Sequence, residues 1–194
     1  LLHEAAEQQL LGFKDGSYRG HKLRLSAFAG CDVVIELALA LDPATDELLI
    51  GIEQVGGHDV VQQVNHLYRF EKSTSAGGYM VLPHGSGYLI HADCPDILPG
   101  EFEKGGLIGA RWTMPMFGMV RGDDAMCIIV DTWWDCDVEA YHEPGDESSL
   151  DFQWVSSLGK LGYARKQRVR FAKSMDYLAM AKLYREQAKR EGLV

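Results

Sequence analysis

The sequence predicts an all-β protein: an antiparallel supersandwich of two large sheets packed face to face, followed by one C-terminal α-helix. Three observations favour this fold class. Short apolar runs alternate with tight turns throughout residues 18–172. Glycine contributes 21 of the 194 residues, above the usual share of about 7%. Helical periodicity is strong only near the C-terminus.

The first 70 residues predict an antiparallel meander. Residues 1–12 mix Leu with Glu and Gln, and could form one short helix or a connection. After them, apolar and polar side chains alternate with the period of half-buried strands. The predicted strands are 18–28, 33–41, 48–55 and 60–70. A meander of this kind needs a second sheet to cover its apolar face.

Two hairpins follow within residues 77–138. In the first, strands 79–83 and 87–90 flank the glycine-rich turn HGSG (84–87). In the second, strands 114–120 and 126–132 flank the turn RGDD (121–124). The Pro- and Gly-rich segment 92–110 predicts a long surface loop, and HEPGDESS (142–149) predicts an exposed turn. Residues 150–155 and 163–172 predict the last strands.

The alternation in these hairpins also predicts a dry inner face. We expect five residues to belong to this packed side or to its immediate neighbours: Met116, Gly118, Cys127, Ile129 and Leu89.

The C-terminal segment predicts the one long helix. Either Ser174 or Asp176 can cap its N-terminus, and Gly192 is placed to end it. Five residues would share one helix face: Tyr177, Met180, Ala181, Tyr184 and Ala188.

Four motifs carry a family resemblance: LPHGSGYLI, MPMFGMVRGDDAMCIIVDT, SLGKLGYARKQRVRF and DYLAMAKLYREQAKREGLV, in this order. With them, residues 77–194, and more loosely 13–70, resemble bacterial glycoside hydrolases of the endo-α-N-acetylgalactosaminidase group. The resemblance implies a galactose-mutarotase-like β-sandwich that precedes a (β/α)8 catalytic barrel. Residues 1–173 would form the sandwich, and 174–194 a helix leading toward a barrel that this sequence lacks.

The resemblance therefore implies a non-catalytic accessory domain that supports or shapes a carbohydrate-binding cleft. Its partners would be carbohydrate and the downstream barrel of the same protein, and the catalytic acids would lie on that barrel. Two alternatives remain open at this stage. The chain could be a free-standing carbohydrate-binding module, or a small sugar enzyme such as an aldose epimerase, which shares this fold type.

Charge and composition argue against other function classes. The net charge is −9, and residues 160–194 hold ten Lys and Arg against three Asp and Glu, or +7, which leaves −16 for residues 1–159. An acidic body disfavours nucleic-acid binding. No apolar run approaches the roughly 18 residues of a membrane span. Because the sequence begins with Leu, we expect an excerpt, which leaves secretion and compartment undetermined.

The best candidates for sugar contact are Trp133 and Trp134 with the nearby acids Asp131 and Asp135. The two Trp follow a strand, and adjacent strand residues point to opposite faces, so one ring can be buried while its neighbour is exposed. An exposed indole could stack on the apolar face of a sugar while carboxylates accept hydrogen bonds from its hydroxyl groups. The competing interpretation is that both rings pack in the core or against another domain.

His84 and Arg121, each in a hairpin turn, are secondary candidates for sugar contact. The turn at His84 lacks the Lys of a P-loop and the G-x-S-x-G frame of a nucleophile elbow. Arg121 is also expected to pair with Asp123 or Asp124. We expect no metal and no cofactor, because His84, His91, Asp93 and Cys94 match no familiar ligand spacing. Cys94 and Cys136 could pair only in an oxidising compartment.

Overall fold

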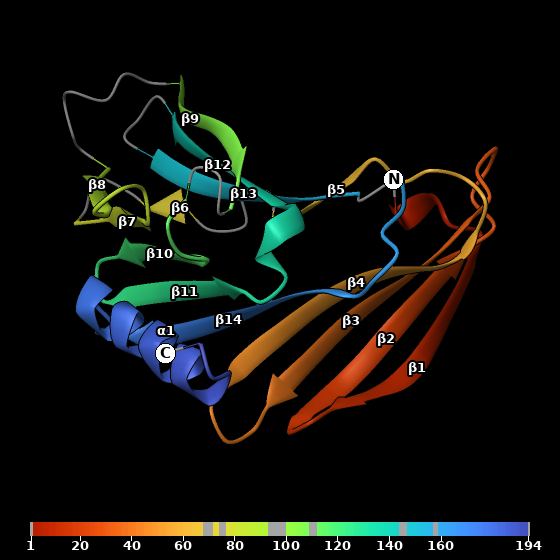
Figure 1. The fold of residues 1–194 in the computed structure, drawn as a ribbon, viewed down its shortest axis with the longest axis horizontal. Helices are drawn as coiled ribbons and strands as arrows, with labels where there is room; N and C mark the ends of the chain where they lie inside the picture. Colours follow the sequence, from red (N-terminus) through yellow and green to blue (C-terminus); the bar gives the residue numbers. More distant parts are fainter. Residues whose placement is uncertain are drawn as a thin grey trace.

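The computed structural model describes residues 2–67, 72–73, 77–92, 100–108, 112–143, 147–156 and 159–193. Within these residues the protein is a sandwich of two antiparallel sheets with one C-terminal α-helix, as the sequence predicts (Figure 1).

The larger sheet contains nine strands in the described part of the chain. They are β1 (Glu7–Asp15), β2 (Tyr18–Ser26), β3 (Val33–Asp42), β4 (Glu47–Gly57), β7 (Tyr79–Leu82), β8 (Tyr88–His91), β10 (Met116–Arg121), β11 (Asp124–Val130) and β14 (Arg165–Lys173). Their order is β1-β2-β3-β4-β14-β11-β10-β7-β8. The late strand β14 therefore joins the N-terminal meander to the half of the sheet that contains β7, β8, β10 and β11.

The smaller sheet has the order β5-β13-β12-β9, and β6 also pairs with β13. Its strands are β5 (Gln63–His66), β6 (Lys72–Ser73), β9 (Gly100–Leu107), β12 (Cys136–Glu143) and β13 (Glu147–Val155). Two 3-10 turns, η1 (Leu2–Glu4) and η2 (Trp133–Asp135), and the helix α1 (Tyr177–Arg190) complete the fold.

Several segments differ from the sequence prediction. Residues 7–12, expected as part of a helix or connection, belong instead to the edge strand β1, which pairs with β2 along its whole length. Part of the predicted 92–110 loop is the strand β9, whose ladder with β12 contains two register shifts. Glycines are common at such irregular positions, which explains why this segment resembles a loop in sequence. Residues 93–99 and 109–111 lie outside the described residues.

Two further boundaries are corrected by the structure. The strand expected over 60–70 is confined to Gln63–His66 within the described residues. The expected exposed turn over 142–149 is shorter, because β12 continues to Glu143 and β13 begins at Glu147. Ser148 and Ser149 are buried rather than exposed.

The main core lies between the two sheets and is rich in aromatic rings. Phe117 of β10 meets Phe152 of β13 edge to face at 5.4 Å between ring centroids, and Trp112 packs on Phe117 at 5.5 Å. These arrangements are the preferred geometries for aromatic pairs. On β13, Trp154 stacks on His66 of β5 at 3.6 Å.

A second core lies on the opposite face of the larger sheet, beneath α1. Met116, Cys127 and Ile129 are buried there, in the cluster that also contains Met180 of α1. The prediction that these residues are packed is confirmed, but they face the helix rather than the smaller sheet. Leu89 is 42% exposed and is therefore not part of the packed side. Gly118 lies under Met180, and a Cβ added to it would come within 2.3 Å of the Met180 sulfur.

Helix α1 begins as the sequence predicts. The Asp176 side chain accepts a hydrogen bond from the Ala179 N–H at 2.8 Å, and Gly192 adopts a φ of +70° after the last turn. The buried face is rotated from the predicted one: Met180 and Ala188 are buried with Gln187, whereas Tyr177 and Ala181 are exposed.

Candidate functional site

The turn η2 marks the point where the chain crosses from the larger sheet to the smaller one. Strand β11 ends at Val130, and the backbone N–H groups of Asp131 and Thr132 then donate to the Lys166 carbonyl at 3.0 and 3.2 Å. The Thr132 Oγ1 accepts from the Lys166 N–H at 2.9 Å. These bonds attach the start of η2 to β14, and β12 begins directly after it (Figure 1).

Both indole rings of η2 are exposed. Trp133 is 37% and Trp134 51% exposed, with ring centroids 5.8 Å apart and planes at 72°. The arrangement that strand geometry would allow, with one ring buried, does not occur, because these residues form a 3-10 turn instead of continuing the strand. Burial of both rings in the core of this chain is also excluded.

Tyr163 packs against the Trp134 ring and is hydrogen-bonded to Asp135. The Tyr163 ring lies 6.1 Å from the Trp134 ring at an angle of 33°, and its hydroxyl donates to Asp135 Oδ2. Burial, followed by the hydrogen bond to Asp135, raises the pKa of Tyr163 to about 12. The phenol is therefore neutral and remains a hydrogen-bond donor over the physiological pH range.

Arg165, at the start of β14, contacts both Asp135 and the Tyr163 ring. Its side chain is fully buried, its Nη2 lies 3.1 Å from Asp135 Oδ2, and its guanidinium carbon lies 3.5 Å from the centre of the Tyr163 ring. Its two terminal nitrogens also donate to the carbonyl oxygens of Tyr163 at 3.0 Å and Val155 at 3.2 Å. A buried guanidinium with this many partners fixes the geometry around it.

The structure separates Asp131 from the Trp pair. Arg168 Nε donates to both carboxylate oxygens of Asp131, at 2.9 and 3.1 Å, and Arg168 also lies 3.3 Å from Glu191 at the end of α1. Burial raises the pKa of Asp131, and the hydrogen bonds from Arg168 oppose that rise. Asp131 therefore takes part in an ion pair that connects β11, β14 and the helix end.

His84 and Arg121 also lie away from the Trp pair. His84 packs against Tyr88 at 5.3 Å and Trp112 at 5.9 Å between ring centroids. Its turn joins β7 to β8, so β10 separates it in the sheet from β11. Arg121 ends β10 opposite Asp124, at the end of β11 remote from η2.

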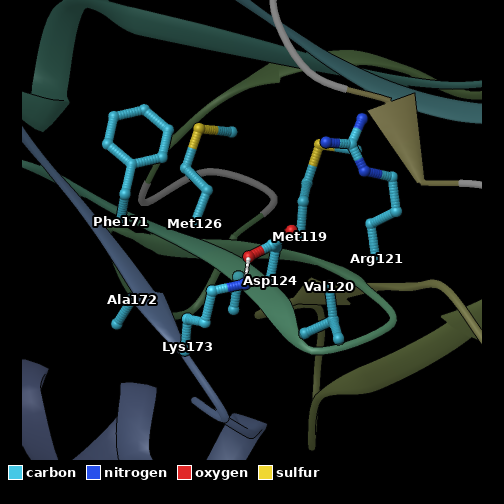
Figure 2. Close-up of a pocket in the computed structure, with 9 residues that line it drawn as sticks. Met119, Val120, Arg121, Asp124, Met126, Phe171, Ala172 and Lys173 are labelled. Atoms are coloured by element: carbon cyan, nitrogen blue, oxygen red, sulfur yellow. Dashed lines mark hydrogen bonds and ion pairs between the residues drawn. The ribbon is translucent and has the colours of Figure 1, made fainter.

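Arg121 lines a cavity of about 420 Å³ at that end of β10, β11 and β14. Two cross-strand rows line it: Met119, Met126 and Phe171, then Arg121, Asp124 and Lys173. Figure 2 shows Phe171, Met126, Met119 and Arg121 projecting from the same side of the sheet. Asp124 pairs with Lys173 at 2.9 Å. Lys173 first, and Arg121 more weakly, lowers the pKa of Asp124.

The described residues can also be compared with the expectations for metal ligands, cysteine pairing and membrane spans. Among them, no group of three His, Cys, Asp or Glu side chains is arranged to hold a metal ion. Cys136 and Cys127 are buried free thiols and Cys31 is an exposed one; Cys94 lies outside the described residues. In that same part of the chain, no helix is both long and apolar enough to cross a membrane.

Of the six candidate residues, the structure thus groups Trp133, Trp134 and Asp135. Sequence reasoning missed Tyr163 and Arg165, which lie about thirty positions further along the chain. Both residues lie in the predicted strand 163–172, but no local pattern links them to Asp135.

Comparison with known proteins places the fold. No family model and no curated protein matches the sequence. The structure of α-N-acetylgalactosaminidase NagBb from Bifidobacterium bifidum in complex with GalNAc matches with a TM-score of 0.80 and 22% identity, over 98% of this chain and 31% of that chain. This sandwich fold occurs within a glycoside hydrolase.

Two more distant solved structures agree. The GH36 α-galactosidase AgaA A355E from Geobacillus stearothermophilus matches with a TM-score of 0.52 and 8% identity, over 88% of this chain and 28% of that chain. The α-galactosidase from Lactobacillus brevis has a TM-score of 0.50 and 10% identity, over 88% of this chain and 27% of that one. The chain thus spans about a third or less of these enzymes, and the likeness confirms the fold that the resemblance implied.

Proposed function

We propose that this chain is a non-catalytic β-sandwich domain of a multidomain glycoside hydrolase, in which it supports or shapes a carbohydrate-binding cleft. One observation carries the proposal: 98% of the chain superimposes on NagBb, whereas only 31% of NagBb is covered. From the names of the similar enzymes, we infer that the complete protein acts on a glycan with α-linked galactose or N-acetylgalactosamine.

The state of the candidate acids supports a non-catalytic role. Glycoside hydrolysis requires two carboxyl groups about 5–9.5 Å apart on opposite sides of the scissile bond. Asp124 is instead paired with Lys173, Asp131 with Arg168, and Asp135 with Arg165. We assign the catalytic acids to a barrel domain downstream in the same protein, which is also the partner of this domain.

Hydrolysis assays test the proposal. We expect the chain alone to cleave neither p-nitrophenyl α-N-acetylgalactosaminide nor p-nitrophenyl α-galactoside, and to leave the anomers of an aldose at their uncatalysed rate. The complete protein encoded by the reading frame that contains this sequence should cleave one of the two glycosides.

Turnover by the chain alone that disappears when Asp123, Asp124 or Asp131 is replaced would overturn the proposal. So would a complete protein that cleaves no glycoside of this class. Catalysed anomer exchange would support the aldose-epimerase alternative instead.

A further inference from the structure

We propose that Trp133 and Trp134 form a preformed platform for one neutral sugar ring, and that Tyr163, Asp135 and Arg165 are its positioning residues. The identity of the ligand rests on the proposed function, but the platform itself rests on the geometry around η2. Three observations support it: the exposure of the rings, the rigidity of their support, and the charge balance beside them.

The exposure of these two rings sets them apart from the other tryptophans. The chain has four, and Trp112 and Trp154 are almost completely buried in the core. Trp133 and Trp134 are adjacent and both exposed, and their planes stand at 72°. Exposed, neighbouring aromatic rings are typical of binding surfaces, because each ring offers a large contact area with few rotatable bonds.

The support beneath Trp134 is rigid because it is anchored in the core. Arg165 is fully buried and holds Asp135, the Tyr163 ring and two backbone carbonyl groups. Tyr163 in turn borders the Trp134 ring and donates to Asp135. A ring held in place before binding loses little conformational freedom when a ligand arrives, which favours affinity.

The chemistry beside the rings fits a neutral, hydroxylated ligand. Asp135 is 19% exposed as a side chain and its charge is balanced by Arg165 at 3.1 Å. The balanced pair therefore provides polar atoms without a strong net field, which disfavours selection of an anion or a cation. A pyranose ring combines an apolar C–H face, which can stack on an indole, with hydroxyl groups that can bond to carboxylate and phenol oxygens.

The test is a titration of the chain with galactose, N-acetylgalactosamine and glucose, read by tryptophan fluorescence and by calorimetry. Because two of the four tryptophans are buried, sugar stacking should alter emission and acrylamide quenching from the exposed pair. We expect Trp134→Ala to weaken binding at least about tenfold, since it removes the stacking ring. Tyr163→Phe keeps the ring but loses the bond to Asp135, and should weaken binding about three- to tenfold.

Phe171→Ala is the matched control. The exposed fraction of Phe171, 49%, is similar to that of Trp134, but Phe171 lines the cavity beside Arg121, away from η2. It should leave sugar affinity unchanged, and thermal unfolding should show that every variant is folded. If Trp134→Ala does not fold, Trp133→Ala takes its place.

Unchanged affinity in Tyr163→Phe, with binding lost in Trp134→Ala, would overturn the positioning role. No response to any of the three sugars at about 100 mM, roughly a hundredfold above a millimolar dissociation constant, would overturn the platform itself. These results are independent of the proposed function, which is decided by hydrolysis with the complete protein.

Discussion

Replacement of Gly118 by Ala tests the docking of α1 on the larger sheet. An added Cβ would lie 2.3 Å from the Met180 sulfur and 3.2 Å from the Val81 Cβ. Carbon and sulfur atoms in contact lie about 3.5–4.0 Å apart, so the sulfur would have to move by roughly 1.2 Å or more. Overpacking of this kind costs about 1–3 kcal/mol. For a domain of this size, that corresponds to a fall of about 2–12 °C in melting temperature.

A double-mutant cycle separates this clash from other effects. Met180→Ala alone should lower the free energy of unfolding by about 2–5 kcal/mol. The Met180 side chain is fully buried, so its removal leaves a cavity. In that background Gly118→Ala should cost less than about 0.5 kcal/mol, since the clashing sulfur is gone. We therefore expect a coupling of about 1 kcal/mol or more between the two changes.

Urea unfolding, followed by far-UV circular dichroism, measures all four members of the cycle. Gly12→Ala is the control, because no atom lies within 4 Å of a Cβ added on the edge strand β1. Its effect should stay within about 0.5 kcal/mol. Additive effects of Gly118→Ala and Met180→Ala, to within about 0.5 kcal/mol, would show that Met180 does not pack on Gly118 and would refute the docking.

Three further predictions follow from buried polar and apolar groups. Ile129→Asp should prevent cooperative folding, because an unpaired charge beneath α1 costs several kcal/mol; a soluble variant with a sharp unfolding transition would contradict this. Burial lowers the pKa of His66 from 6.5 to about 4, so the unfolded state binds its proton first as the pH falls. Stability should therefore decrease from pH 6.5 toward pH 4, by about 3 kcal/mol at most, and urea unfolding of His66→Leu should show a weaker pH dependence. Asp131→Ala should lower the melting temperature by leaving Arg168 without its main partner, while sugar affinity stays unchanged; lost affinity in a folded variant would place Asp131 in the binding site.

The sequence predicts those parts of the fold that depend on local chemistry. Alternation identifies β3 and β4, the RGDD turn contains Gly122 with a φ of +61°, and Asp176 caps α1. Burial on both faces limits what alternation can show. After Asp124, strand β11 continues as AMCIIV without a charged residue, because one face meets the smaller sheet and the other meets α1. The sequence therefore does not show which residues of β11 face the smaller sheet and which face α1.

The candidate site was predictable only in part for a different reason. Two adjacent Trp beside acids are visible in the sequence, but their 3-10 conformation depends on the bonds of Asp131 and Thr132 to Lys166. The support from Arg165 and Tyr163 is a contact between distant segments. No spacing rule relates such residues before the strands are paired.

The central position of β14 affects how the protein can be assembled during synthesis. Strands β1–β4 and strands β7, β8, β10 and β11 are complete when residue 130 has been made, yet among the described strands only β14, ending at Lys173, joins the two groups. Until then the edges of β4 and β11 present unpaired backbone groups, which are templates for intermolecular pairing. Pairing of segments that are distant in the sequence is also slow, which prolongs the exposure of these edges. The two halves of the larger sheet therefore cannot join before β14 has been made.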